Sequence, residues 1–533
     1  MDARGGSGGR RSRRPPHRAA APSLPARTAS TRRPRAVSRA RPEGEVHRVD
    51  ALNDAIVSVN DVFWGYLLIP FLLLSAVYFT VRSGVVQVRL FPEMFRVLRG
   101  QPPAAADGKK AISSFQAFAI SAASRVGTGN IVGVATAIAL GGPGAVFWMW
   151  LMALLVGSAA FVESTLAQLY KVRDRAGFRG GPAYYMQFGL GARWMGLVFA
   201  VVITLTFGFI FNSVQANSIA DSISSSAEAA GLGAGPGLFW GVGIALAVLV
   251  GAVIFGGVRR IAHVAQLLVP FMALAYLVIG LAVVAMNLGE IPRVLGDIVS
   301  GAFGVREFVS GGIGAAIVQG MRRGMFSNEA GLGSAPNAGA TAAVSHPVKQ
   351  GLVQTLGVYF DTLLICSITA FIVLIADPAY GEREGASLTQ ASLEANLGVW
   401  AVHALTVILF LLAFTSVLGN YYYGESNLRF MSASNGVMAG YRVLVLGMVL
   451  AGSVAPLDLV WTMADVFQGV MATVNLIAIA PLAGIAFLLL RDYTAQRKEG
   501  RDPVFTRDRL PGVTGVQCWE NETDLAPEPG ERL

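Results

Sequence analysis

Two apolar stretches of this chain carry glycines, hydroxyls and an asparagine where a membrane-spanning helix would normally be uniformly apolar. Residues 121–134 read SAASRVGTGNIVGV, and residues 320–338 read GMRRGMFSNEAGLGSAPNA. Unwound backbone at membrane depth is tolerated only where protein buries it or where it lines a cavity, because lipid offers no hydrogen-bond partners. A pair of such breaks in corresponding halves of a chain is typical of a binding site at mid-membrane. The sequence therefore predicts two broken helices around one site.

The first break centres on Thr128, Gly129 and Asn130. Glycine lets the backbone unwind and allows a ligand to approach closely. The N–H groups freed at the start of the following half-helix can bind an anion, and the carboxylate of a zwitterion would suit them. A helix-packing face of small residues is the alternative interpretation of these glycines. The presence of the second break favours a binding site.

The second break places an aromatic side chain among polar ones. Phe326 is expected to form a wall of the pocket, and carbonyls near Gly324 to Ser327 are expected to accept hydrogen bonds from an ammonium group. Charges near the ends of spans cost little. Arg322, Arg323 and Glu329 therefore fit a cytoplasmic gate or helix-end anchors, and an ordinary structural role fits them equally.

Two neighbouring hydroxyls, Thr415 and Ser416, lie within the later apolar run AFTSVLGNYYYGE. Hard cations prefer oxygen ligands. These hydroxyls, facing carbonyls opened by the first break, would suit Na⁺. Alternatively, both hydroxyls bond back to carbonyls of their own helix.

Carboxylates inside apolar spans are functional hypotheses by default because they are costly to bury. Asp361, in VYFDTLLIC, is the strongest candidate for a proton relay, although neighbouring hydroxyls would satisfy it equally well. Gln215 and Asn217 would line the same cavity or link helices by hydrogen bonds. The four carboxylates within or near the spans are Glu163, Asp221, Asp361 and Asp465.

The composition is that of a polytopic, all-α membrane protein. Of the 533 residues, 53% are hydrophobic and only 14% are charged, and the mean hydropathy is +0.54. A soluble domain has about 25% charged residues. The net charge of +9 would raise nucleic acid as a partner of a soluble protein, but the positive residues lie in loops and tails, so topology explains them better. Two cysteines and five scattered histidines match no metal or haem motif, and we expect no cofactor.

About 20 apolar residues are needed to cross a membrane, and the sequence contains eleven candidate spans. Without the first span, ten remain as two sets of five, each opening with a broken helix. An odd number of spans in each set makes the two sets inverted relative to one another. The candidates begin near Val62, Phe115, Ala145, Trp194, Leu238, Val264, Glu307, Gln350, Trp400, Val437 and Trp461.

Basic loops predict the orientation, because cytoplasmic loops carry an excess of Lys and Arg. Basic residues follow the first, third, fifth and last spans, whereas residues 222–237 contain none. The carboxyl terminus is therefore expected inside and the amino terminus outside. The basic leader contradicts this orientation unless it is disordered, distant from the first span or absent.

Five segments follow from these patterns. Residues 1–50 form a disordered basic leader; a start at a valine codon near Val46 or Val49 would make this leader an artefact, which N-terminal sequencing would test. Residues 51–110 hold the extra amino-terminal helix and a basic cytoplasmic loop. Residues 111–290 and 291–492 form the two inverted repeats, and residues 493–533 form a cytoplasmic tail.

Several long motifs, in order, resemble the alanine or glycine:cation symporter family, also called sodium:alanine symporters. They are VGTGNIVGVATAIALGGPGAVFWMW, GGPAYYM, VQANSIAD, GMFSNEAGLGSAPNA and the QG…FDT…C run from Gln350 to Cys366. The resemblance covers about Val57 to Phe505. It implies Na⁺-coupled, occasionally H⁺-coupled, import of alanine or glycine on a LeuT-type 5+5 inverted-repeat fold with one extra amino-terminal helix.

The resemblance also extends to a wider set of transporters, because VGTGN looks like the VGLGN break of neurotransmitter:sodium symporters. Carried over, it implies a Na⁺ site formed by the carbonyls of Ala123 and Val126 and the hydroxyls of Thr415 and Ser416. Asn130 would bind or orient the substrate. Asn420 departs from the tryptophan associated with this position in some alanine-binding members, which implies a wider or more polar pocket.

The resulting prediction is a secondary active transporter that imports alanine, or glycine, with sodium. It would span the inner membrane of a bacterial cell many times, surrounded by lipid. The alternative is a proton-coupled symporter that uses Asp361 or Glu163. A channel is disfavoured because no ring of filter residues is evident, and an enzyme is disfavoured because no nucleophile and base pair stands out. The oligomeric state stays open.

Overall fold

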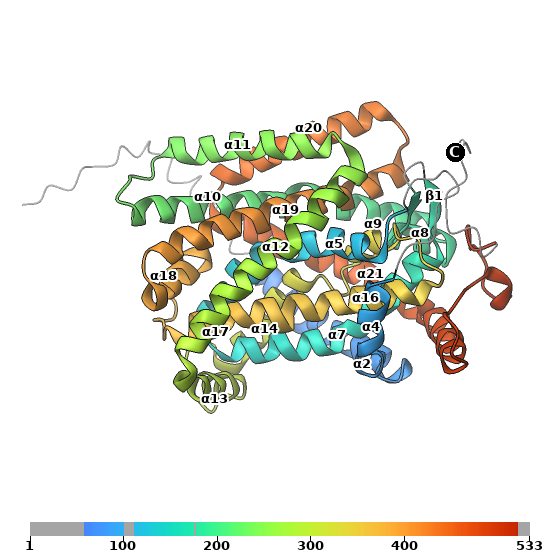
Figure 1. Cartoon of the computed structure of the whole chain (residues 1–533), viewed down its shortest axis with the longest axis horizontal. Coiled ribbons are helices and arrows are strands. Elements are labelled where there is room, and N and C mark those ends of the chain that lie inside the picture. Colours follow the sequence, from blue (N-terminus) through green and yellow to red (C-terminus); the bar gives the residue numbers. More distant parts are fainter. Residues whose placement is uncertain (1–57, 101–110, 175–176, 307, 521–533) are drawn as a thin grey trace, which may run out of the picture. The chain divides into compact units, whose positions relative to one another are not determined.

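The computed structural model describes residues 58–100, 111–174, 177–306 and 308–520. The predicted leader, residues 1–50, lies outside the described residues, as does the end of the predicted tail. The described chain is almost entirely helical (Figure 1), and its one sheet is a short antiparallel hairpin of Val172–Asp174 (β1) and Gly177–Arg179 (β2).

Nine helices in the described part of the chain are long and apolar enough to cross a membrane. Three of them each contain a π-helical turn (η1, η3 or η5), so that one span carries more than one label. The nine spans are Ser58–Arg82, Gly144–Leu169 (α7), Arg193–Ala229, Pro236–Ile254 (α11), Gly257–Met286 (α12), Pro347–Ile375, Trp400–Met431 (α19), Asn435–Val454 (α20) and Leu457–Lys498 (α21).

Within the divided spans and between the others lie shorter elements. The divided spans contain η1 (Phe63–Leu68), α2 (Ile69–Arg82), α9 (Arg193–Leu205), η3 (Thr206–Phe211), α10 (Asn212–Ala229), α16 (Pro347–Tyr359), η5 (Phe360–Cys366) and α17 (Ser367–Ile375). The connections contain α3 (Val86–Arg89), α4 (Phe91–Leu98), α8 (Pro182–Phe188), η4 (Leu288–Glu290), α13 (Ile291–Ala302), α18 (Gly385–Leu397) and η6 (Arg507–Arg509).

Two further segments are the broken spans that the sequence predicts. The first runs through α5 (Ser114–Arg125), η2 (Gly129–Gly133) and α6 (Val134–Gly141). The second runs through α14 (Gly312–Asn328) and α15 (Ala335–Gly339). With the nine continuous spans they make the expected eleven, and each opens a set of five.

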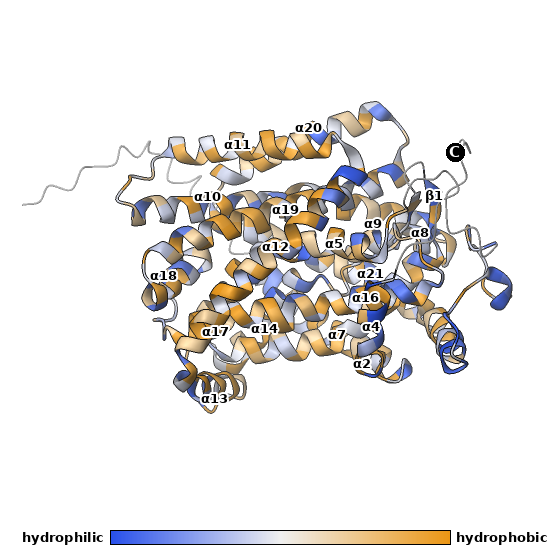
Figure 2. Cartoon of the chain, in the orientation of Figure 1, coloured by the Kyte–Doolittle hydropathy of each residue, from blue (hydrophilic) through white to orange (hydrophobic). Residues whose placement is uncertain are grey.

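The broken spans lie together at the centre of the bundle. α14 packs on α6 and α7, whereas α5 packs on α12, α15 and α19. Figure 1 shows α14 beside α7 and α16. Long stretches of the outer helices expose large apolar side chains, such as Leu267, Phe271 and Leu274 on α12. Figure 2 shows hydrophobic residues along most of the helix lengths and hydrophilic ones gathered near α4 and β1, as a lipid-embedded bundle requires.

The bounds of α12 and α14 differ from the sequence prediction. α12 begins at Gly257, before the expected start near Val264, so Arg259 and Arg260 lie in its first turn. Gly257 has a φ of 74°, in the left-handed region that favours glycine, and this residue allows α11 to turn directly into α12. α14 begins at Gly312, after the expected start near Glu307.

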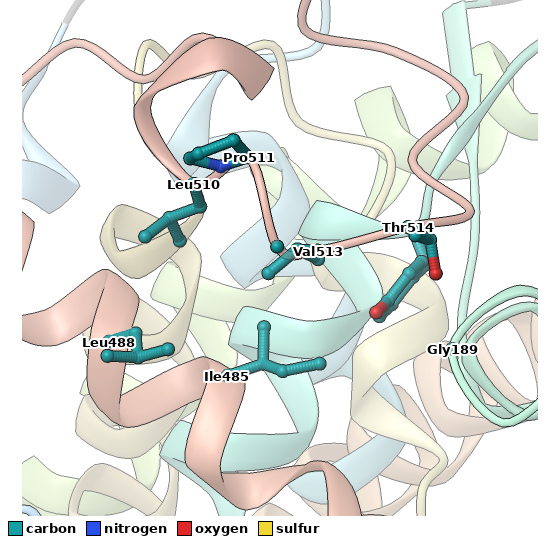
Figure 3. A pocket seen from close by; sticks show the side chains of 9 residues that line it. Gly189, Ile485, Leu488, Leu510, Pro511, Val513 and Thr514 are labelled. Carbon is teal, nitrogen blue, oxygen red and sulfur yellow. The ribbon is translucent and has the colours of Figure 1, made fainter.

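The segment after α21 folds back onto one end of the bundle, which we call the tail end. α21 continues to Lys498, past the predicted boundary at residue 492. The Phe505 amide donates to the Ser345 carbonyl at 2.8 Å, and the Trp519 indole donates to the Gln168 carbonyl at 3.2 Å. We call residues 499–520, which follow α21, the tail. The tail covers a cavity of about 400 Å³ (Figure 3). α21 and residues near the ends of α7 and α8 line the rest of this cavity.

Candidate functional site

The first break begins where α5 ends at Arg125 and the backbone of Val126 leaves the helical region, with φ −80° and ψ 84°. Asn130 bridges this gap, because its Oδ1 accepts a hydrogen bond from the Gly127 amide at 2.9 Å. The Thr128 amide donates to Gln215 Oε1 at 3.1 Å. Gln215, on α10, therefore meets the first break as the sequence predicted it could.

The second break is an unwound loop held by a buried carboxylate. Glu329 has a φ of 58°, and Gly331 and Gly333 have φ of 81° and 78°. Their amides donate to Glu163 on α7, from Gly331 to Oε1 at 3.3 Å and from Gly333 to Oε2 at 3.1 Å. Asn475 Nδ2 donates to Glu163 Oε2 at 2.8 Å and to the Gly331 carbonyl at 2.9 Å. Glu163 thus satisfies backbone groups that the break has freed.

Asp361 joins the two breaks. Its Oδ1 accepts from Asn130 Nδ2 at 2.6 Å, and its Oδ2 accepts from Ser327 Oγ at 2.8 Å and from Thr362 Oγ1 at 2.9 Å. All four residues are fully buried. Asp361 lies on η5, whose π-helical turn sits at the level of both breaks. The sequence predicted Asp361 as a buried acid. Its contacts with Asn130 and Ser327 were missed, because a single sequence does not show which distant residues contact one another.

Phe326, the predicted pocket wall, lies against the first break. A Cβ atom on Gly129 would come within 3.0 Å of the Phe326 ring and 3.1 Å of Ser327 Cα. The Phe326 ring packs between Phe211 at 4.6 Å and Trp461 at 4.8 Å between centroids. Gly129, the second glycine in VGTGN, therefore allows the two breaks to touch. Three aromatic rings enclose this side of the contact.

The predicted sodium ligands partly come together. Ser416 Oγ donates to the Ala123 carbonyl at 2.9 Å, and Gly127 lies directly against this hydroxyl. Thr415 Oγ1 lies 3.4 Å from Met272 Sδ. Both hydroxyls also bond to the Leu412 carbonyl of their own helix, at 2.9 Å and 3.0 Å, which is the alternative geometry. The structure thus brings α19 onto the end of α5, next to Val126.

Asn420 lies one turn further along α19 and belongs to a different cluster. Ser124 Oγ is 2.6 Å from both Asn420 Oδ1 and Glu329 Oε1. Glu329 Oε2 in turn accepts from Ser334 Oγ at 2.6 Å. Asn420 therefore connects α19 to the second break through Ser124, whereas the Phe326 ring packs against Phe211 and Trp461.

Arg322 and Arg323 lie on α14 before the break and away from the tail end. Arg323 pairs with Asp465, in the first third of α21, whereas the tail follows the other end of that helix. A gate role for these arginines on the cytoplasmic side would require the tail end to face the opposite side from the one that the basic loops predict. α14 enters the bundle from the end that carries α13, which placed both arginines on the opposite side of the break.

The cavity in Figure 3 is separate from these residues. Its lining includes Tyr170, Ile485, Leu488 and Leu510, none of which belongs to either break.

Comparison with known proteins shows the family to which this chain belongs. A model of the sodium:alanine symporter family matches residues 49–507. The chain belongs to this family. Among similar proteins, the amino-acid carrier protein AlsT of Bacillus subtilis is 51% identical over 89% of this chain and 99% of its own length. The probable sodium/glutamine symporter GlnT of the same species is 50% identical over 86% of this chain and 94% of its own length.

A more distant relative is the sodium/alanine symporter AgcS of Methanococcus maripaludis, 37% identical over 83% of this chain and 97% of its own length. Among solved structures, that of MhsT in complex with L-phenylalanine matches with a TM-score of 0.53 and 11% identity, covering 72% of this chain and 98% of MhsT. At that identity the match concerns the fold alone, and it confirms the LeuT-type architecture. As a member of this family, the chain is a multi-pass membrane protein that transports amino acids with sodium.

Proposed function

We propose that this symporter imports a small neutral amino acid, with alanine as the first candidate and glycine as a second, and that the two breaks hold amino acid and sodium together. One observation carries the proposal: the first break contacts the Ser416 hydroxyl at Ala123 and the second break, through Asp361, at Asn130. An ion and a substrate bound to one unwound segment would each stabilise the geometry that the other needs.

In this proposal Na⁺ sits between α5 and α19, held by the carbonyls of Ala123 and Val126 and the hydroxyls of Thr415 and Ser416. Carbonyl and hydroxyl oxygens are the donors that a hard cation prefers. Sodium adjacent to the break would fix the unwound backbone in place. Each Na⁺ entering the cell gains about 2.3 kcal/mol per 100 mV of membrane potential, which exceeds the ~1.4 kcal/mol that corresponds to a tenfold accumulation of substrate.

The amino acid would lie beside the same segment. Its carboxylate would meet the amides of Thr128 to Asn130, and its ammonium group would meet carbonyls near Ser327. Phe326, enclosed by Phe211 and Trp461, would border the side chain and limit its size. Relatives named for alanine and for glutamine belong to the same family. The polar cluster of Asn420, Ser124 and Glu329 would admit a larger or more polar side chain than a tryptophan at position 420 would.

The tail end faces the cytoplasm in this proposal, and the protein resides in the inner membrane of a bacterial cell. Basic residues gather at this end, where Arg96 and Lys349 pair with Asp502 of the tail. The amino terminus would then lie outside. Alternating access would come from rocking of the helices that hold both breaks against the remaining spans. The protein would catalyse no reaction and need no cofactor.

Proton coupling is the second candidate, and in that case Asp361 would be the coupling residue. This carboxylate is surrounded by neutral donors, Asn130, Ser327 and Thr362, which would tolerate a change in its protonation. Glu163, by contrast, holds the backbone of the second break and would release it on protonation.

Uptake of radiolabelled alanine into proteoliposomes tests the proposal, with and without an inward Na⁺ gradient, at fixed pH and membrane potential. We expect accumulation that depends on Na⁺ and that unlabelled glycine reduces by competition. Accumulation driven only by a proton gradient would support Asp361 as the coupling site. Na⁺-dependent accumulation of glutamine without any alanine uptake would overturn the choice of substrate.

A further inference from the structure

A cluster of buried charges covers Phe326 on the side away from the tail end. Arg322 and Arg323 lie one turn before Phe326 on α14, and each is only 5% exposed. Arg323 Nη2 is 2.6 Å from Asp465 Oδ2, and Arg322 Nη1 is 3.5 Å from the same oxygen. Two buried guanidinium groups thus converge on one buried carboxylate, and burying an unbalanced charge is costly.

The first span supplies the missing charge. Asp61 Oδ1 pairs with Arg322 Nη2 at 2.8 Å. One turn later, the fully buried Trp64 donates from its indole N–H to the Asp465 carbonyl at 3.2 Å, and its ring lies 5.3 Å from the Arg322 guanidinium carbon. The span Ser58–Arg82 precedes both predicted repeats, yet it touches the second broken helix and α21 at the same point.

The charged cluster connects directly to the aromatic wall of the candidate site. The Arg323 guanidinium carbon lies 4.7 Å from the Trp461 ring centre, and that ring packs on Phe326 at 4.8 Å. If the site opens toward this end by separation of α14 from α21, that movement breaks the ion pair of Arg323 with Asp465 and parts the rings of Trp461 and Phe326.

We call the contacts of α14 with α21, the Arg323–Asp465 ion pair and the Trp461–Phe326 ring pair, the closure. We propose that the first span stabilises this closure, because Asp61 and Trp64 keep the site shut on the side away from the tail. Asp61 holds Arg322, so that Asp465 is left to Arg323, and Trp64 fixes the backbone of α21 at Asp465. Asp61 is a positioning residue, since it acts on the closure through Arg322. This inference rests on the proposed function only in that the closed site must hold an amino acid.

The exposure of Asp61 sets the size of the effect. Its side chain is 57% exposed, whereas that of Arg322 is 6% exposed, so solvent weakens their attraction. Without the Asp61 charge, Arg322 would turn toward Asp465, only 3.5 Å away, and compete with Arg323. The closure would loosen without unfolding the protein.

The test measures how fast bound substrate escapes. Full-length protein in nanodiscs is loaded with radiolabelled alanine in Na⁺, diluted into unlabelled alanine, and filtered over time. We expect Asp61→Asn to speed release about fivefold, which corresponds to ~1 kcal/mol, and Asp61→Glu to restore slow release. Trp64→Phe, which keeps the ring but removes the N–H donor, should also speed release. The Na⁺ concentration for half-maximal binding should stay within about twofold of wild type, because both residues are remote from Ser416.

Asp458→Asn is the matched control, because it removes the same charge from an exposed residue in the first turn of α21. Its release rate should equal that of wild type. Release from Asp61→Asn and Trp64→Phe at the wild-type rate would overturn the inference, as would equal acceleration by Asp458→Asn. Failure of wild type to bind alanine in Na⁺ would instead overturn the proposed substrate, and the same release measurement would then be made with glutamine.

Discussion

At the scale of single residues, the site is defined by which side chains cross from one break to the other. Asn130 closes its own break through Oδ1 and reaches Asp361 through Nδ2. Asp361 then reaches Ser327 in the second break. A single asparagine amide therefore makes the conformation of each break depend on the other. Such a link is what coupling between two ligands requires, because coupling is a free energy shared between sites.

Replacing Asp361 tests this link. Asp361→Asn keeps the shape but removes the charge and one strong acceptor, so Asn130 or Ser327 loses a charge-assisted hydrogen bond. We expect alanine uptake to fall at least about tenfold, the factor for ~1.4 kcal/mol, while the protein still folds. Uptake by proteoliposomes and the elution profile of the purified protein measure the two effects. Unchanged uptake would remove Asp361 from the site.

The two hydroxyls on α19 make a separate prediction. Thr415→Ala and Ser416→Ala should each raise the Na⁺ concentration needed for half-maximal uptake by about tenfold, because a lost ligand costs on the order of 1 to 2 kcal/mol. Thr473→Ala is the control, since Thr473 Oγ1 bonds to the Gly469 carbonyl of its own helix. Na⁺ dependence of the Thr415 and Ser416 variants equal to that of Thr473→Ala would favour simple back-bonding.

At the scale of the elements, the second break depends on three residues in the left-handed region, Glu329, Gly331 and Gly333, and on the buried acid Glu163. Gly333 has φ 78°, and a Cβ there would lie 2.6 Å from Pro182 Cγ and 2.9 Å from the Asn475 side chain. Pro182 and Asn475 belong to α8 and α21, so the unwound loop is wedged between two elements that close the tail end of the site.

Gly333→Ala should therefore damage the break. The strained φ alone costs roughly 1 kcal/mol or more, and the contact with Pro182 adds to it. We expect lower thermal stability in detergent and uptake close to background. Gly289→Ala, where a Cβ would meet nothing within 4 Å, is the control. Wild-type stability and uptake in Gly333→Ala would show that the loop can rearrange freely.

The sequence alone predicted these elements well and their partners poorly. Glycines and an asparagine inside apolar runs located both breaks, and apolar length located the eleven spans. The sequence did not predict that Glu163 accepts hydrogen bonds from the backbone of the second break. A buried acid in an apolar span is equally compatible with a proton relay and with this structural role. The end of the bundle at which Arg322 and Arg323 lie was not predictable either, because it depends on which end of the bundle α14 enters. Pairings between distant residues, such as Asp61 with Arg322, leave no local pattern.

At the scale of the whole molecule, the site lies between two closures of different construction. Away from the tail end, ion pairs and aromatic rings join α14, α21 and the first span. At the tail end, residues 499–520 cover the loop that follows the second break, where Gln168 Nε2 donates to the carbonyls of Gly339 and Ala342 at 2.6 Å and 2.9 Å. Since the indole of Trp519 bonds to the Gln168 carbonyl, movement of the broken helix at this end must disturb the tail.

Lys171, just after α7, makes the folding stability of the protein depend on pH. Burial lowers the pKa of Lys171 from the usual 10.5 to about 7. Contacts of Nζ with the rings of Phe178 at 3.9 Å and Trp519 at 4.3 Å favour the ammonium form and oppose part of that shift. Between pH 7 and 10.5, the unfolded chain binds a proton at Lys171 that the folded chain does not, so folding stability rises with pH across this window and is flat below it.

Lys171→Met removes both the charge and the cost of burying it. We expect the variant to melt on the order of 2 °C above wild type at pH 7, and the difference to shrink as the pH rises toward 9.5, because only wild type gains stability over that range. Melting of the purified protein in detergent at several pH values measures this difference. Parallel curves would mean that Lys171 keeps its proton when buried, because the two aromatic rings and the hydrogen bonds from Nζ to Gln168 Oε1 at 2.9 Å and to the Ala342 carbonyl at 3.4 Å outweigh the loss of water around the ammonium group.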